Sequence, residues 1–182
     1  MQLKNLNILL NQWGKYVVQQ SRSRLTKGKK NVDKNLYNSI KYQLQNNNKG
    51  AILFFEMLSY GKFQDQGVKG KDPSIIDRWT KGRLKGKQKA PNSPFSYKTK
   101  MPPSTPLGEW AKKRNIRLRN DKGQFVRGNY KSIGYVLSKF IYAQGIKPSL
   151  FFTKSLETSR KRYSNELAKA LAKDIEDNLK NK

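Results

Sequence analysis

The organisation of this chain is decided at residues 131–156, which read KSIGYVLSKFIYAQGIKPSLFFTKSL. Apolar residues recur there with the spacing of one helical face, which predicts an amphipathic helix from about Ser132 to Gln144. Gly145 favours the left-handed backbone that closes a helix, and Pro148 cannot be drawn back into one. The chain therefore turns sharply, and three large apolar residues follow the turn: Leu150, Phe151 and Phe152.

These three apolar residues have two interpretations. They form either a corner of the hydrophobic core or a contact between subunits. Because neighbouring side chains of an extended segment point to opposite faces, Phe151 and Phe152 cannot both enter one layer. We expect one to pack under the 132–144 helix, and the other to face the last helix or a neighbouring subunit.

The pattern on either side of this segment predicts an α+β domain. An apolar stripe predicts an N-terminal helix that ends near Gln20, and the basic run over residues 21–34 is typical of a mobile loop. Alternation near residues 39–44 and the apolar run AILFFEM at 51–57 predict two antiparallel strands. A long final helix is expected from about Thr153 to Leu179, and part of it should project or contact a neighbour.

A strongly basic segment, residues 80–101, interrupts this pattern. Its cations stand among Gly, Pro and Ser with little to bury, so we expect an insertion that does not order itself. It is either a solvated loop or an arm that touches DNA phosphates or an acidic neighbour. The candidate contact residues are Lys81, Arg83, Lys85, Lys87, Lys89, Lys98 and Lys100.

The composition limits the function. The 182 residues suit a single domain with this insertion, and 39 Lys and Arg against 12 Asp and Glu give a net charge of +27. Such an excess attracts polyanions and favours a component of an assembly. Cysteine and histidine are absent, which excludes disulfides, zinc–thiolate sites, and catalysis by Cys or His. The N-terminus is not typical of a signal peptide, and no run reaches the length of a membrane span.

Carboxylates are the remaining candidates for catalysis. A metal-dependent nuclease needs two or three converging carboxylates, and the group worth testing is Glu56, Asp65, Asp72 and Asp77. No acidic-x-Lys arrangement follows a strand, and the glycine-rich segment YGKFQDQGVKG at residues 60–70 lacks the pattern of a nucleotide loop. We therefore expect no enzyme activity, catalytic residue, cofactor or metal.

Several segments resemble one protein family. The chain has GIKPSLFFTKSLE before the last helix, the Leu-x-x-Ser-Ile segment of KNLYNSIKY before the first strand, and Tyr-x-x-x-x-Asp-x-Gly-x-x-Gly in YGKFQDQGVKG. In these features it resembles the neck or tail-completion (head–tail connector) proteins of tailed double-stranded DNA phages. The resemblance covers both ends of the chain well and the middle poorly.

The resemblance implies a structural virion protein of the phage neck or head-proximal tail, made in the bacterial cytoplasm. It implies a homo-oligomeric ring around the DNA channel, with adjacent virion proteins on the portal or tail side and packaged DNA as partners, and no membrane. The alternative is a free protein that binds nucleic acid without sequence preference. The expected fold is a small antiparallel sheet covered by the N-terminal helix and the 132–144 helix, with the long C-terminal helix beside it.

Overall fold

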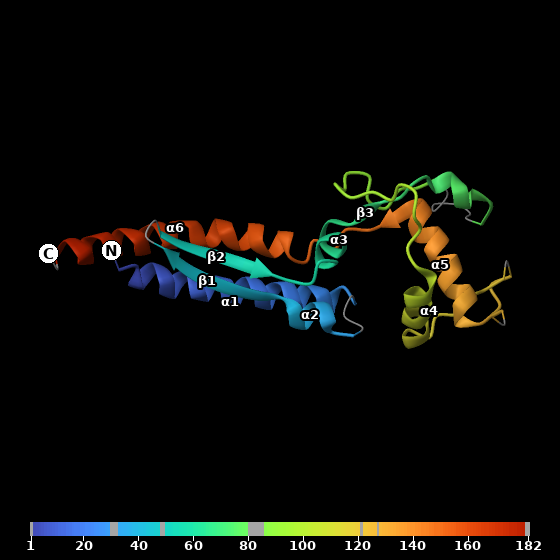
Figure 1. Cartoon of the computed structure of the whole chain (residues 1–182), viewed down its shortest axis with the longest axis horizontal. Helices are drawn as coiled ribbons and strands as arrows, with labels where there is room; N and C mark the ends of the chain where they lie inside the picture. Colours follow the sequence, from blue (N-terminus) through green and yellow to red (C-terminus); the bar gives the residue numbers. More distant parts are fainter. Residues whose placement is uncertain are drawn as a thin grey trace. The chain divides into compact units, whose positions relative to one another are not determined.

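The computed structural model describes residues 2–29, 33–47, 50–79, 86–120, 122–126 and 128–180 (Figure 1). Its contacts divide the chain into two compact units. Unit 1 comprises Met1–Gly61 and Leu150–Lys182, and unit 2 comprises Lys62–Ser149. The part that interrupts unit 1 is therefore much longer than the expected insertion at residues 80–101. The α+β class is confirmed, since long helices accompany small antiparallel strand pairs.

Two long antiparallel helices, α1 (Lys4–Lys27) and α6 (Thr153–Lys180), form the frame of unit 1 (Figure 1). Trp13 donates its indole N–H to the Ser159 hydroxyl at 2.8 Å, and its ring lies 6.1 Å from that of Tyr163. The buried residues Ser21, Ser155 and Ser159 are small, which lets the two helices approach closely.

Helix α1 continues two turns beyond the predicted end at Gln20, so the expected loop over residues 21–34 is wrong for residues 21–27. The reason is packing. Leu25 lies on the same face as Val17 and Val18 and is 1% exposed in the core of unit 1. Burial of a leucine stabilises the helix by about 2 kcal/mol, enough to extend it through a basic and otherwise polar stretch.

A short helix α2 (Asn35–Ser39) leads into the predicted hairpin of β1 (Lys41–Asn47) and β2 (Gly50–Glu56). The strands pair in the register Leu44↔Leu53, and the hairpin contacts α1 through one face. Because side chains of a strand alternate between its two faces, Ile52 and Phe54 lie on the other face, where they are 45% and 41% exposed. Unit 1 therefore presents an apolar strand face to its surroundings.

Both phenylalanines of the corner enter the core of unit 1. Phe151 is fully buried in a cluster with Val18, Leu25, Leu36 and Ile40. The ring of Phe152 packs edge-on against that of Phe55, with 5.4 Å between the ring centres. The prediction that one of them packs under the 132–144 helix is wrong. Leu150 adopts a left-handed backbone (φ 50°), and the two rings follow it in a turn, so the alternation of an extended strand does not apply.

Unit 2 consists of short elements around one helix pair. Strand β3 pairs antiparallel with β4 in the register Val68↔Ile146 and Lys69↔Gly145. Gly145 has φ +84°, and a side chain there would meet the carbonyl oxygen of Val68, so the close pairing requires glycine. In chain order the elements are α3 (Gly61–Gln66), β3 (Val68–Lys69), the 3-10 helix η1 (Pro73–Trp79), α4 (Ser104–Lys113), α5 (Tyr130–Gln144) and β4 (Gly145–Ile146).

Helix α5 matches the predicted helix within two residues, but its partner differs from the expected one. It packs against α4 inside unit 2, whereas the hairpin that it was expected to cover belongs to unit 1. The two helices approach at Gly134, where a side chain would meet the backbone of Ser104 and Gly108. Amphipathicity predicted that α5 packs on something; it could not identify the partner.

The described part of the basic insertion, residues 86–101, belongs to the fold. Lys89 donates its backbone N–H to the Gln144 carbonyl at 2.8 Å, and the Gln88 amide both donates to and accepts from the backbone of Gly70 at 2.9 Å. The backbone N–H of Tyr97 reaches Lys69 O at 2.9 Å, and Ala90 is buried. The expectation of a solvated loop is therefore wrong for residues 86–100, because these long-range bonds replace the missing apolar content.

Candidate interaction surfaces

The predicted basic contact residues divide into two groups. Lys81, Arg83 and Lys85 lie outside the described residues. The other four belong to the described residues and are exposed: Lys87, Lys89, Lys98 and Lys100. Hydrogen bonds within unit 2 hold their backbone in place. The Tyr142 hydroxyl donates to the Lys98 carbonyl at 2.9 Å, and the rings of Tyr97 and Tyr142 lie 6.2 Å apart. Burial raises the pKa of Tyr97 above its ordinary value.

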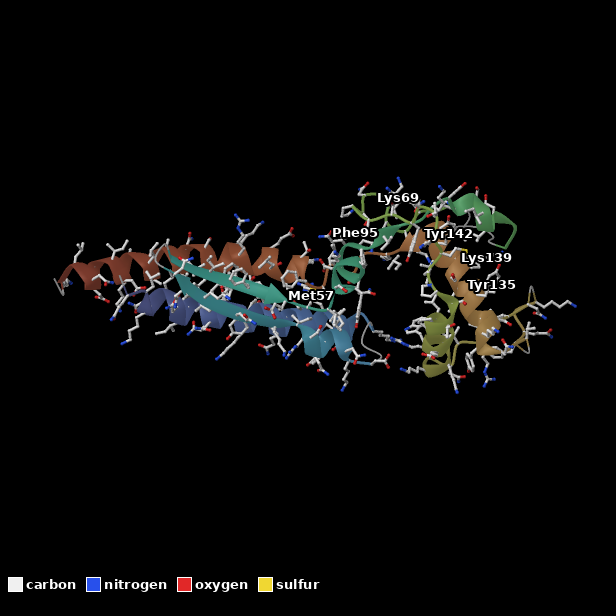
Figure 2. The ribbon with its side chains drawn as sticks, viewed as in Figure 1. Met57, Lys69, Phe95, Tyr135, Lys139 and Tyr142 are labelled. Atoms are coloured by element: carbon white, nitrogen blue, oxygen red, sulfur yellow. The ribbon has the colours of Figure 1, made fainter. Side chains whose placement is uncertain are left out.

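Unit 2 also displays cations over aromatic rings (Figure 2). The Lys139 ammonium lies 5.0 Å from the centre of the Tyr135 ring one turn earlier on α5, and the Lys62 ammonium lies 5.3 Å from the Phe63 ring. With 21 basic and 5 acidic residues, this unit has a net charge of +16. Cations interleaved with exposed rings suit contact with phosphates and bases.

One part of this surface lies on either side of the polar turn at residues 120–123, in a segment whose pattern is typical of a hairpin or an exposed loop. Arg119 and Phe125 form an isolated antiparallel bridge, and the Arg119 guanidinium stacks 4.2 Å from the centre of the Phe125 ring. Arg117 lies 5.8 Å from the same ring, which is 59% exposed. The spacing of the arginines in RNIRLRN, with an aromatic residue after the turn, was the available signal.

A groove of about 770 Å³ lies in unit 1 between the second half of α1 and β1. The buried side chains of Val18 and Ile40 contribute to its apolar lining, together with the partly buried Tyr42. Among the described residues that line it none is acidic, and four are basic: Lys15, Arg22, Lys27 and Lys41. The groove thus combines an apolar lining with basic groups.

Arg22 gives this groove its fixed geometry. Its guanidinium donates to the carbonyl oxygens of Tyr37 and Ile40, both at 3.0 Å, and lies 5.1 Å from the centre of the Tyr37 ring. These bonds join α1 to the segment that leads into β1. Arg22 is therefore structural, whereas Lys15, Lys27 and Lys41 are exposed at the groove.

The last turns of α6 carry a second apolar surface of unit 1. Leu171, Ile175 and Leu179 recur every four residues and are 39%, 44% and 68% exposed. Residues 164–180 include three basic and four acidic side chains, so this part of a highly cationic chain is nearly neutral. The side chain of Glu176 is 62% exposed and pairs with Lys180 at 2.5 Å. We call Leu171, Ile175 and Leu179 the α6 stripe.

The position of the stripe is set by Asp174, which is 2% exposed and faces the start of α1. Its carboxylate accepts the backbone N–H groups of Asn5 and Leu6, both at 2.8 Å, and the Asn5 amide at 2.7 Å. Burial raises the pKa of Asp174, but the hydrogen bonds from Leu6 and Asn5 outweigh it and hold the pKa below its ordinary value. A carboxylate at a helix N-terminus also complements the helix dipole.

The structure bears out the core interpretation for two of the three corner residues. Phe151 and Phe152 belong to the core of unit 1, and Leu150 is 42% exposed at its surface. A subunit contact through Leu150 stays a prediction. The three residues are adjacent and apolar, a pattern that does not distinguish a core from an interface.

All four carboxylates considered for a nuclease lie among the described residues. Within the described part of the chain, no group of three or more acidic residues could hold a metal ion. Asp72 accepts the backbone N–H of Ser74 at 2.9 Å, which lowers its pKa, and Asp77 accepts that of Gly86 at 3.1 Å. Both carboxylates therefore bond to the local backbone.

Across the described ranges, no helix is both long enough and apolar enough to cross a membrane. Comparison with protein-family models, curated proteins and solved structures finds no match for this chain.

Proposed function

We propose that this chain is a structural virion protein of the phage neck or head-proximal tail, where copies assemble into a ring around the DNA channel. One observation carries the proposal: the chain separates a strongly cationic surface from a nearly neutral apolar one. Unit 2 has a net charge of +16 and exposes aromatic rings, whereas the α6 stripe exposes leucine and isoleucine where charges almost cancel.

Each surface suits a different partner. Copies of a protein with a net charge of +27 repel one another, so self-association is most favourable where the local charge is small and apolar side chains are exposed. The cationic surface suits a polyanion such as DNA. A ring whose copies meet through unit 1 and hold DNA through unit 2 uses both surfaces, in line with the resemblance of the sequence to head–tail connector proteins.

The test is the oligomeric state of the purified full-length chain, measured by sedimentation velocity and negative-stain imaging. We expect closed rings at micromolar concentration. Protein that associates only when DNA is added, and forms no ring in its absence, would contradict the proposal.

That contradictory outcome would support the second candidate, a free protein that binds nucleic acid without sequence preference. The cation–aromatic pairs of unit 2 favour it, above all Arg119 over Phe125, because such pairs suit both phosphates and bases. A free binder needs no contact between copies, so the α6 stripe would have no function in it.

A further inference from the structure

We propose that the groove between α1 and β1 of one copy receives the α6 stripe of the next copy, in a head-to-tail contact. The proposal rests on the proposed function, because it specifies the contact through which copies would assemble. Its starting observation is that unit 1, besides the exposed strand face at Ile52 and Phe54, has two surfaces whose chemistry is complementary. The groove has an apolar lining and basic side chains, and the stripe is an apolar helix face in a segment with a net charge of −1.

The chemistry of the groove favours an amphipathic helix. An apolar helix face bound in a groove is a common mode of recognition, read through side chains spaced by three or four residues. Leu171, Ile175 and Leu179 have that spacing. The lining near Val18 and Ile40 offers them an apolar surface, which a phosphate backbone could not use.

Charge complementarity supports the same occupant. The groove has Lys15, Lys27 and Lys41 exposed along it, and no described residue of its lining is acidic. Beside the stripe lies the exposed carboxylate of Glu176, and residues 164–180, with three basic and four acidic side chains, have a net charge of −1. Docking the stripe therefore brings a slightly acidic helix end to a basic groove, while most other surfaces of a chain with net charge +27 would repel the groove.

The placement of the two surfaces makes the contact heterologous. Asp174 fixes the end of α6 beside the start of α1, whereas the groove lines the second half of α1. The surfaces thus lie toward opposite ends of the α1–α6 helix pair. A contact between two different surfaces repeats from copy to copy, and it closes into a ring when the rotation between copies allows.

Single-surface variants test the contact in the full-length chain. The stripe variant is Ile175→Asp, at a side chain that is already 44% exposed, and the groove variant combines Lys15→Glu with Lys41→Glu. We expect each to raise the dissociation constant for self-association by about tenfold or more. The matched control is Lys112→Glu, an exposed charge reversal on α4 of unit 2, which should assemble as the wild type does.

A mixing experiment separates this contact from a self-complementary one. The stripe variant keeps an intact groove and the groove variant keeps an intact stripe, so an equal mixture should form a dimer that grows no further. If stripes instead paired with each other, the groove variant alone would still assemble. That result would overturn the proposal. Thermal melting checks that each variant is folded, and Leu179→Asp, at the most exposed residue of the stripe, replaces Ile175→Asp if that variant fails to fold.

The outcomes also distinguish this proposal from the function on which it rests. Rings that form equally well in wild type, stripe variant and groove variant would overturn the head-to-tail contact and leave the connector proposal standing. A wild-type chain that stays monomeric at every concentration would overturn both. A groove variant that assembles normally but binds a DNA duplex less tightly would show that the groove takes a polyanion, and would overturn the contact.

Discussion

Asp174 shows how a single residue holds the two ends of unit 1 together. The first turn of α1 has no side-chain cap of its own, and the carboxylate of Asp174 accepts two of its backbone N–H groups instead. A buried donor left without an acceptor costs about 1–3 kcal/mol. The start of α1 therefore depends on a residue of α6 that lies 169 positions from Asn5 in the chain.

We predict that Asp174→Asn lowers the free energy of unfolding at pH 7 by about 1–3 kcal/mol. Asparagine keeps one acceptor oxygen but loses the charge and replaces the second oxygen with an amide donor. Urea unfolding followed by circular dichroism measures the change. Glu176→Gln is the control, because this carboxylate is exposed and forms an ion pair with Lys180 one turn along the helix, which should contribute about 0.5 kcal/mol or less.

The low pKa of Asp174 also predicts a dependence on pH. Because the folded-state pKa lies below the unfolded value of about 4, this carboxylate stabilises the fold above that pH, and its contribution falls as the pH drops through the folded-state pKa. The stability difference between wild type and Asp174→Asn should therefore shrink in acid. A difference that stays constant from pH 7 to pH 3 would contradict this assignment.

Phe151 is the residue on which the core of unit 1 depends most. It is fully buried between α1 and the segment that precedes β1, so Phe151→Ala should lower the free energy of unfolding by about 3–5 kcal/mol. Phe152 is only partly buried, and Phe152→Ala should cost less. Leu150→Ala, at the exposed neighbour, is the control. If chemical denaturation shows that Phe151→Ala and Leu150→Ala lower the free energy of unfolding equally, the core lies elsewhere.

At the scale of elements, the segment 86–100 illustrates order that comes from neighbours. We predict slow amide exchange at Lys89 and Tyr97, because their N–H groups bond to Gln144 and Lys69. Gln88→Ala removes both bonds to Gly70 and should speed exchange across the segment, while the exposed Lys87→Ala should not. Hydrogen exchange read by mass spectrometry decides this, and wild-type exchange at the unfolded-chain rate would contradict the fold described for the segment.

Helix α6 is long because it serves two partners along its length. Its first half packs on α1 through Ser155, Ser159 and Tyr163, all buried. Its last turns keep contact through Asp174 on one side and expose the α6 stripe on the other. In Figure 1 the end of α6 extends past the start of α1 within unit 1. The expectation that part of this helix projects is thus met by its C-terminal end.

At the scale of the whole molecule, the net charge of +27 should dominate binding to DNA. Contact with roughly six phosphates lowers affinity by about a thousandfold between 50 and 200 mM salt. We therefore predict steep salt dependence and no sequence preference for duplex DNA, measured by fluorescence anisotropy. An affinity that barely changes with salt would remove DNA from the electrostatic partners.

The same titration can locate the contact. If the surface of Arg117 and Arg119 binds DNA, replacing both with glutamine should make the slope of log affinity against log salt concentration shallower. The change should correspond to the loss of about two phosphate contacts. Lys154→Gln, an exposed cation at the start of α6, is a control in unit 1. An unchanged slope in the double variant would place the DNA contact on other cations.

The sequence by itself determined the elements whose signals are local. The apolar period of α5, the strand alternation and the start of α6 at Thr153 all appear in the structure within about three residues of their predicted places. The net charge likewise follows from composition alone. Each of these depends on residues a few positions apart, so the pattern carries the information.

Tertiary structure alone decided which surfaces meet. It paired α5 with α4, extended α1 through Leu25, placed Phe151 and Phe152 in one core, and ordered residues 86–100. The groove and the Asp174 cap likewise join segments distant in sequence. The physical reason is that burial and hydrogen bonding reward any partner of suitable shape and polarity, so an amphipathic pattern shows that a face must be covered without saying by what.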